Sequence, residues 1–186
     1  MLEQFRYLKE DLKRWKVSSP KGYFYLLFEL GIWATVNYRV RRALYQVQIP
    51  VVKQILRIIT FVLFKLSEIF LGVAISSQTA IGPGLYIGHT GVILLHPNVK
   101  VGKNFNIGNC VTIGSRGDGH SGVPVIADNV YVHTGAKIIG NIRIGSNVRI
   151  GANAVVLSDL PDNTTAVGVP ASIVSIRSND KIVIKV

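Results

Sequence analysis

The chain has 186 residues, of which 48% are hydrophobic and 17% are charged, and its formal net charge is +11. This apolar content excludes a disordered chain, and the length is enough for one or two domains with a hydrophobic core. The single cysteine, Cys110, excludes an intrachain disulfide, so the fold needs no oxidising compartment.

The positive charge is concentrated toward the N-terminus, because residues 1–72 hold 12 basic and 5 acidic side chains. Such an excess suits nucleic acid, an anionic membrane surface or a phosphorylated ligand. No helix-turn-helix, zinc-finger or RNA-binding signature is present, so we expect no nucleic-acid partner. Residues 1–21 lack the apolar core of a cleavable signal peptide, and we expect a cytoplasmic protein.

Residues 1–73 are predicted to form a basic, amphipathic helical region. Its apolar stretch 51–71 contains four charged residues, each of which costs about 2.5–3.5 kcal/mol at the centre of a bilayer, so it should not span. The stretch 22–38 is short for a span and contains Glu29, and we expect it to be buried or interfacial.

A helix is predicted to begin after Pro50 and to end at Gly72, with its polar side chains gathered on one side. Two interpretations remain open. The helix packs within a helical domain or at a subunit interface, or residues 22–72 lie on an anionic membrane at the inner face. In the second case the residues near the headgroups are Arg39, Arg41, Arg42, Lys53 and Arg57.

Residues 74–174 show a six-residue period of aliphatic side chains, and 15 of the 18 glycines follow Gly72. This period fits neither an α-helix nor a single flat strand. It is typical of a triangular coil in which each hexapeptide forms one short strand and one corner, and Gly, Asn and Ser at the corners supply permissive backbone angles. The repeating positions are Ile75, Ile81, Ile87, Ile93, Val99, Val101, Ile107, Ile113, Ile126, Val132, Ile138, Ile144, Ile150 and Val156.

The hexads resemble the left-handed parallel β-helix of the bacterial hexapeptide transferases; spacing alone does not give the handedness. The segments 81–91, 111–114, 135–140, 150–156 and 167–171 are similar to serine O-acetyltransferases and their relatives in polysaccharide gene clusters, and the N-terminal region is more similar to the latter. The resemblance implies a mainly β fold after a helical N-terminal region, with a loop at 115–124 and a C-terminal tail at 175–186.

The resemblance also implies an acetyl-CoA-dependent O-acetyltransferase with direct transfer and no metal. The catalytic base of the family matches His89, and His120, in the loop that breaks the six-residue register, is the second candidate. Two acids of the family are missing. The residue before the base is Gly88, and the residue 15 positions before it, where a carboxylate orients the imidazole, is Ala74.

For acetyl-CoA, used as a co-substrate, the resemblance implies a groove between the coils of two subunits of a homotrimer. Ser115, Thr134 and Ala152 match its lining. Lys137, Arg143 and Arg149 occupy one slot in successive hexads, so they should lie on three different faces and cannot form one phosphate clamp.

The expected acceptor is a hydroxyl of a sugar or polysaccharide intermediate, because Gly88 removes an acid that would hold an amino group. The alternatives are L-serine O-acetylation, N-acetylation of a sugar nucleotide, and a non-catalytic β-helix scaffold. A scaffold would need neither His89 nor the loop 115–124.

Overall fold

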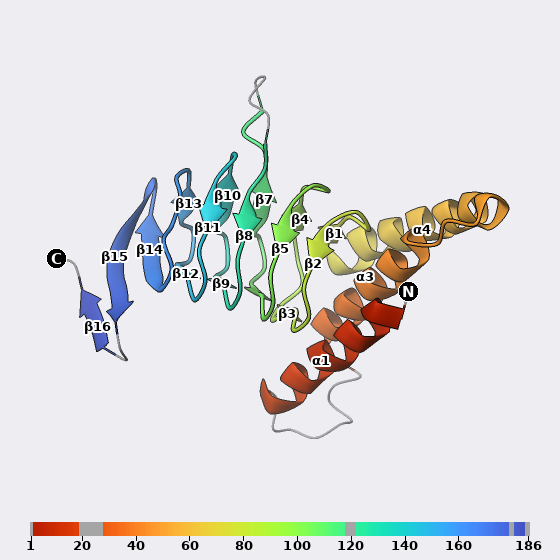
Figure 1. The fold of residues 1–186 in the computed structure, drawn as a ribbon, viewed down its shortest axis with the longest axis horizontal. Helices are drawn as coiled ribbons and strands as arrows, with labels where there is room; N and C mark the ends of the chain where they lie inside the picture. Colours follow the sequence, from red (N-terminus) through yellow and green to blue (C-terminus); the bar gives the residue numbers. More distant parts are fainter. Residues whose placement is uncertain (1, 19–27, 118–121, 179–180, 185–186) are drawn as a thin grey trace.

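The computed structural model describes residues 2–18, 28–117, 122–178 and 181–184, and it places three helices at one end of a long parallel β-helix (Figure 1). The helices are α1 (Leu2–Ser18), α3 (Leu30–Tyr45) and α4 (Pro50–Leu71). Pro50 lies in the first turn of α4, and Gly72 ends this helix in the left-handed conformation with φ 64°. Among the described helices, none is long and apolar enough to cross a bilayer.

The β-helix has three sheets, and successive strands of the chain pass from one sheet to the next. The first sheet contains β1 (Val73–Ile75), β4 (Ile93–Leu95), β7 (Thr112–Gly114), β10 (Lys137–Ile139) and β13 (Val155–Val156). The second contains β2 (Ala80–Ile81), β5 (Lys100–Val101), β8 (Val125–Ile126) and β11 (Arg143–Ile144). The third contains β3 (Tyr86–Ile87), β6 (Asn106–Ile107), β9 (Tyr131–Val132), β12 (Arg149–Ile150), β14 (Thr164–Gly168), β15 (Ala171–Ser178) and β16 (Lys181–Ile184).

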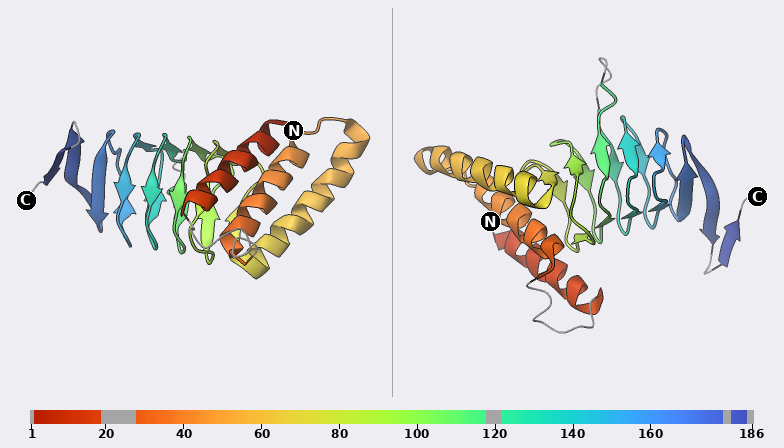
Figure 2. Two further views of the ribbon diagram at one scale, coloured as in Figure 1. Left: turned by 90° about the horizontal axis from the view of Figure 1, so that it is seen from below. Right: turned by 180° about the vertical axis from the view of Figure 1, so that it is seen from behind.

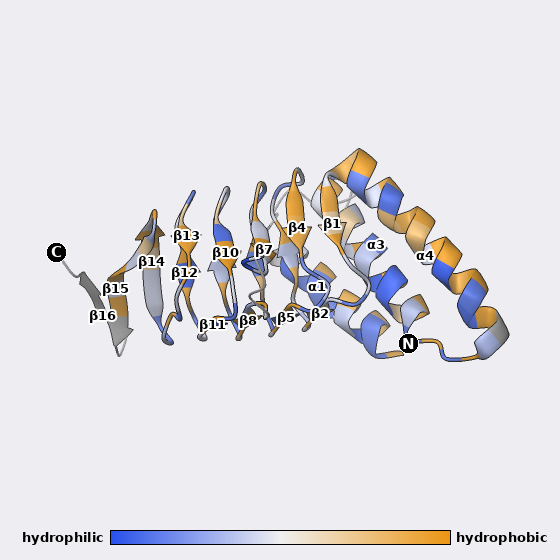
Figure 3. Ribbon diagram, turned by 90° about the horizontal axis from the view of Figure 1, so that it is seen from above, coloured by the Kyte–Doolittle hydropathy of each residue, from blue (hydrophilic) through white to orange (hydrophobic). Residues whose placement is uncertain are grey.

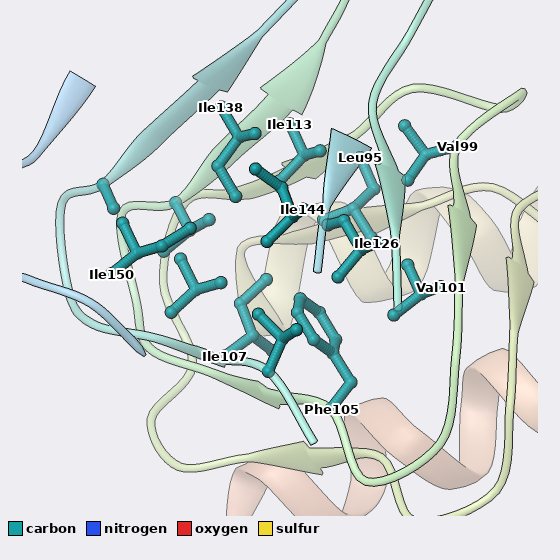
Figure 4. Packing of buried hydrophobic residues seen from close by; sticks show 14 of the residues in the cluster. Leu95, Val99, Val101, Phe105, Ile107, Ile113, Ile126, Ile138, Ile144 and Ile150 are labelled. Carbon is teal, nitrogen blue, oxygen red and sulfur yellow. The ribbon is translucent and has the colours of Figure 1, made fainter. Parts of the chain in front are cut away.

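The predicted fold class is confirmed, because the strands pair in parallel from β1 to β14 and the six-residue period points into the coil. Every one of the 14 repeating aliphatic residues is at most 6% exposed. Figure 4 shows several of these side chains, among them Ile107, Ile126 and Ile144, meeting inside the triangle together with Phe105. The parallel order ends at β14, since β15 and β16 pair antiparallel and close the far end of the coil.

The corners take left-handed backbone at glycines such as Gly84 and Gly135 and at asparagines, as predicted for these two residue types. Asn104, Asn129 and Asn147 donate along one edge in a ladder of amide hydrogen bonds of 2.8–3.0 Å that ends on Asn163. The glycines that follow the inward aliphatic residues serve close approach instead. A Cβ at Gly82, for example, would lie 2.7 Å from the carbonyl oxygen of Gly102 in the next coil.

The three helices cover the open end of the first coil (Figure 2). Helix α3 lies against β3 and packs between α1 and α4. Its Gly31 allows this approach, because a Cβ there would overlap the carbonyl oxygen of Ile87 at 2.0 Å.

A buried ion pair joins α1, α3 and the first coil. The carboxylate of Asp11 accepts hydrogen bonds from Arg39 Nε at 2.7 Å and from the backbone N–H groups of Gly84 and Leu85 at 2.7 and 2.8 Å. Arg39 also donates to the carbonyl oxygens of Ile81 and Gly82 at 2.7 and 2.6 Å. Both side chains are fully enclosed, so the pair replaces water at the otherwise unpaired edge of the coil.

Neighbouring side chains complete this edge. Tyr38 donates its hydroxyl to the carbonyl of Thr79 at 2.7 Å, Arg41 donates to the carbonyl of Ile75 at 2.8 Å, and Arg42 donates to two further carbonyls. Burial lowers the pKa of Arg41 to about 10, so its guanidinium stays charged at neutral pH. The prediction that Arg39, Arg41 and Arg42 face membrane headgroups is therefore wrong; the coil's carbonyl groups hold them.

Helix α4 also differs from the expectation, because part of its polar side points inward. Ser67 is buried and donates to the carbonyl of Val73 at 3.0 Å, and the buried Thr60 donates to the carbonyl of Arg57 at 3.0 Å. Much of the aliphatic side faces outward (Figure 3).

We predict that Asp11→Ala lowers the free energy of unfolding by about 3–5 kcal/mol, because it leaves Arg39 buried without its counter-ion. The matched control is Glu10→Ala, which breaks an exposed pair with Lys13 and should cost at most about 1 kcal/mol. Urea unfolding of the full chain measures both, and equal losses would contradict the role given to the buried pair.

Candidate functional site

His89 lies at the corner between β3 and β4, on the first coil, and its side chain is exposed. The strand register fixes what stacks beside it. Ile87 pairs with Ile107, Ile107 with Val132, and Val132 with Ile150. Each of these four aliphatic residues is followed, two positions later, by a corner residue. The four corner residues form what we call the His89 edge: His89, Asn109, Thr134 and Ala152.

Backbone hydrogen bonds hold successive corners of this edge together. The carbonyl of Asn109 accepts from the N–H of Gly135 at 2.9 Å, and the carbonyl of Thr134 accepts from the N–H of Asn153 at 2.9 Å. Thr134 also donates its hydroxyl to Asn109. With strands about 4.8 Å apart, His89 and Ala152 are separated along the edge by roughly 14 Å.

The His89 turn is also attached to the helical end of the molecule. The N–H of Gly91 donates to the carbonyl of Leu71 at 3.1 Å, and the N–H of Ile93 donates to that of Gly72 at 2.8 Å. The C-terminal end of α4 therefore positions this turn.

Ser115 lies on a different edge. Each residue of the His89 edge precedes a strand of the first sheet, whereas Ser115 follows β7 of that sheet. A three-residue strand spans about 10 Å, so one chain does not bring Ser115 to Thr134 and Ala152. His120 falls outside the described residues; the flanking parts of the loop leave the coil after β7 and return to it at β8 (Figure 1).

Nothing in the described part of the chain orients the imidazole of His89 through a hydrogen bond or an ion pair. Ala74 lies in β1 beside Leu94, and Gly88 precedes His89, so neither of these positions supplies a carboxylate. Tautomer and ring orientation are therefore not fixed by an acid among the described residues.

The other two described histidines have different surroundings. Nδ1 of His96 accepts the N–H of Asn98 at 3.2 Å, which is a local turn contact on the Ser115 side of the first sheet. His133 is exposed, and its ring packs on Tyr131 at 4.3 Å between centroids. It adjoins Thr134, so it flanks the His89 edge.

The basic residues of the repeats lie on three faces as predicted, because Lys137, Arg143 and Arg149 belong to β10, β11 and β12 of the three sheets. Lys137 is engaged, since its ammonium donates to the carbonyls of Cys110 and Gly135 at 2.8 Å each. The described residues contain no group of three or more His, Cys, Asp or Glu side chains arranged to hold a metal.

The His89 edge thus combines an exposed imidazole with corners that carry small or neutral side chains. An imidazole can take a proton from a hydroxyl, and exposed backbone at such corners can bind an extended amide-containing ligand. The sequence alone did not identify Asn109 as a residue of this edge. The strand register identifies it, because it aligns Asn109 with Thr134.

Comparisons with known proteins agree with this architecture. The family model described as bacterial transferase hexapeptide (six repeats) matches residues 124–158. The serine acetyltransferase of Synechococcus elongatus is 39% identical over 84% of this chain and 62% of its own length, so this chain spans less than two thirds of that relative.

The serine acetyltransferase of Bacillus pumilus is 31% identical over 91% of this chain and 77% of its own length. The crystal structure of serine acetyltransferase from Brucella abortus in complex with coenzyme A matches with a TM-score of 0.80 and 30% identity, covering 92% of this chain and 68% of that one. The chain therefore belongs to the hexapeptide-repeat transferases, in the branch that includes the serine acetyltransferases.

Proposed function

We propose that the protein is an acetyl-CoA-dependent O-acetyltransferase with His89 as its general base. The observation that carries this proposal is the position of an exposed His89 at the head of an edge that also holds Thr134 and Ala152. The relatives named serine acetyltransferase, one of them with coenzyme A bound, support the reaction class.

In this mechanism the imidazole of His89 takes the proton of the acceptor hydroxyl as its oxygen attacks the thioester carbonyl. The tetrahedral intermediate collapses with loss of the coenzyme A thiolate, which takes the proton back from the imidazolium. The ester bond forms as the thioester bond breaks, and no covalent enzyme intermediate is needed.

We further propose that acetyl-CoA lies in a groove between two subunits of a homotrimer. Thr134 and Ala152 would contribute from one chain and Ser115 from the next, since the two sets stand on opposite edges of the first sheet. His120, from the loop 115–124, remains the second candidate for a base or a substrate contact across the same interface.

For the acceptor, the names of the relatives favour L-serine over the carbohydrate expected from the sequence. A carbohydrate hydroxyl is kept as the second candidate because of one observation: Gly88 and Ala74 leave the described surroundings of His89 without a carboxylate. A zwitterion as small as serine offers few groups to bind, so its selection needs fixed opposite charges. Within the carbohydrate proposal, residues 22–72 would hold the enzyme at a membrane surface.

We predict that His89→Ala lowers turnover by roughly 100-fold or more, as expected for a lost general base, and changes the KM for acetyl-CoA by only a few-fold. His120→Ala should have the smaller effect on turnover. Release of free thiol from acetyl-CoA measures both parameters.

The matched control is Lys103→Ala, because the exposed Lys103 lies at the corner after β5, away from both the His89 edge and the Ser115 edge. Turnover of this variant should match that of the wild type. If His89→Ala turned over as fast as Lys103→Ala, His89 would have no place in the mechanism.

The acceptor is tested by supplying acetyl-CoA with L-serine or with lipid-linked oligosaccharide and following thiol release. We predict acetylation of L-serine as the proposal best supported. Transfer to the glycan alone would reverse the order of the two acceptors. If neither acceptor led to thiol release, both acceptor proposals would be contradicted, and the fold would be unaffected.

A further inference from the structure

Helix α4 has an exposed apolar arc that no described part of the chain covers. When the helix is projected at 100° per residue, eight exposed aliphatic or aromatic residues fall within about 120° without an intervening charge. The arc consists of Val52, Ile55, Ile58, Ile59, Val62, Leu66, Ile69 and Phe70. Ile58, Ile69 and Phe70 are the most exposed, at 67%, 71% and 74%.

The polarity of α4 is inverted relative to a helix that packs on a water-soluble core. Its buried strip contains Thr60 and Ser67, whose hydroxyls are satisfied by backbone carbonyls, while the apolar arc faces away. Such an arrangement requires an apolar phase outside the chain, because an exposed apolar surface of this kind is costly in water.

The apolar surface continues from the arc onto α3. A groove between the two helices is lined by Trp33, Val36, Val40, Leu63 and Leu66, and the indole of Trp33 is half exposed. Aromatic rings of this kind are favoured where an apolar phase meets water.

Net charge indicates what covers the arc. The rim on the side away from α3 carries Lys65, which pairs with Glu68 at 2.7 Å, while Arg57 projects to the opposite side of the helix; the whole chain has a net charge of +11. This net charge favours an anionic bilayer, which carries the opposite sign, over a second copy, which carries the same sign. No described helix can span, so α4 must lie in the plane of the surface.

We propose that the arc of α4 is a docking surface for an anionic membrane, with its apolar residues in the boundary between headgroups and acyl chains. Lys65 lies at the level of the headgroups, Arg57 points away from the bilayer, and Arg39, Arg41 and Arg42, which hold the first coil, take no part. Since the His89 turn is bonded to the C-terminal end of α4, docking places the first coil closest to the bilayer. The surface assignment does not depend on which acceptor is acetylated.

The test is flotation of the full chain with vesicles of phosphatidylcholine alone or with phosphatidylglycerol added. The wild type should bind the anionic vesicles and lose binding as salt rises, because salt screens the headgroup attraction. The double substitution Ile58→Ser with Ile69→Ser should weaken binding at least about tenfold. Arg57→Gln with Lys65→Gln should weaken it about fivefold in total, because Glu68 already neutralises part of the charge of Lys65.

The matched control removes two exposed lysines from the second sheet side of the coil, Lys100→Gln with Lys103→Gln, and should bind like the wild type. Circular dichroism checks that each variant keeps its helices. The proposal is overturned if the wild type ignores anionic vesicles, or if the serine variant binds them as well as the wild type. It is also overturned if the serine variant loses its oligomeric state in the absence of lipid, since a second copy would then cover the arc.

Discussion

The open end of the first coil is the constraint on which the rest of the structure depends. A parallel coil satisfies its backbone through its neighbours, and the first coil has no neighbour on one side. Asp11 and Arg39 close this end, and each buried polar atom of the pair finds a partner on the coil or on the other helix. Without these contacts the edge would expose unpaired strand groups, and α1 and α3 would lose buried contacts to the first coil.

Much of the fold could be predicted from the sequence because the hexad period directly records which side chains point inward. Ile87, Ile107 and Val132 are six-residue repeats in the sequence and neighbours in the third sheet. The roles of the arginines could not be predicted, since Arg39 and Arg41 occur among basic residues that a sequence alone assigns to a surface. Their partners are carbonyl groups of the first coil. Every residue has a carbonyl group, so the sequence does not indicate which ones an arginine will contact. For the same reason the sequence did not indicate that Gly82 is needed for close approach to the backbone of Gly102.

The candidate site was predictable only in part. Resemblance supplied His89, Thr134 and Ala152, and the register then places them on one edge and adds Asn109. Resemblance could not indicate that Ser115 stands across the first sheet from them, because that depends on which corner follows which strand. The local sequence also does not show which group orients His89, because Ala74 and Gly88 stand where the family has carboxylates. The proposed division of the site between two chains would account for both features.

We propose that acetyl-CoA binds along the His89 edge, and a crystal structure with coenzyme A bound would test this position. In that structure we expect the thiol within hydrogen-bond reach of the His89 imidazole, about 3 Å, and the pantetheine arm running past Asn109 and Thr134 toward Ala152. A neighbouring subunit should present Ser115 to the same ligand. Coenzyme A bound along another edge, with its thiol far from His89, would contradict the account.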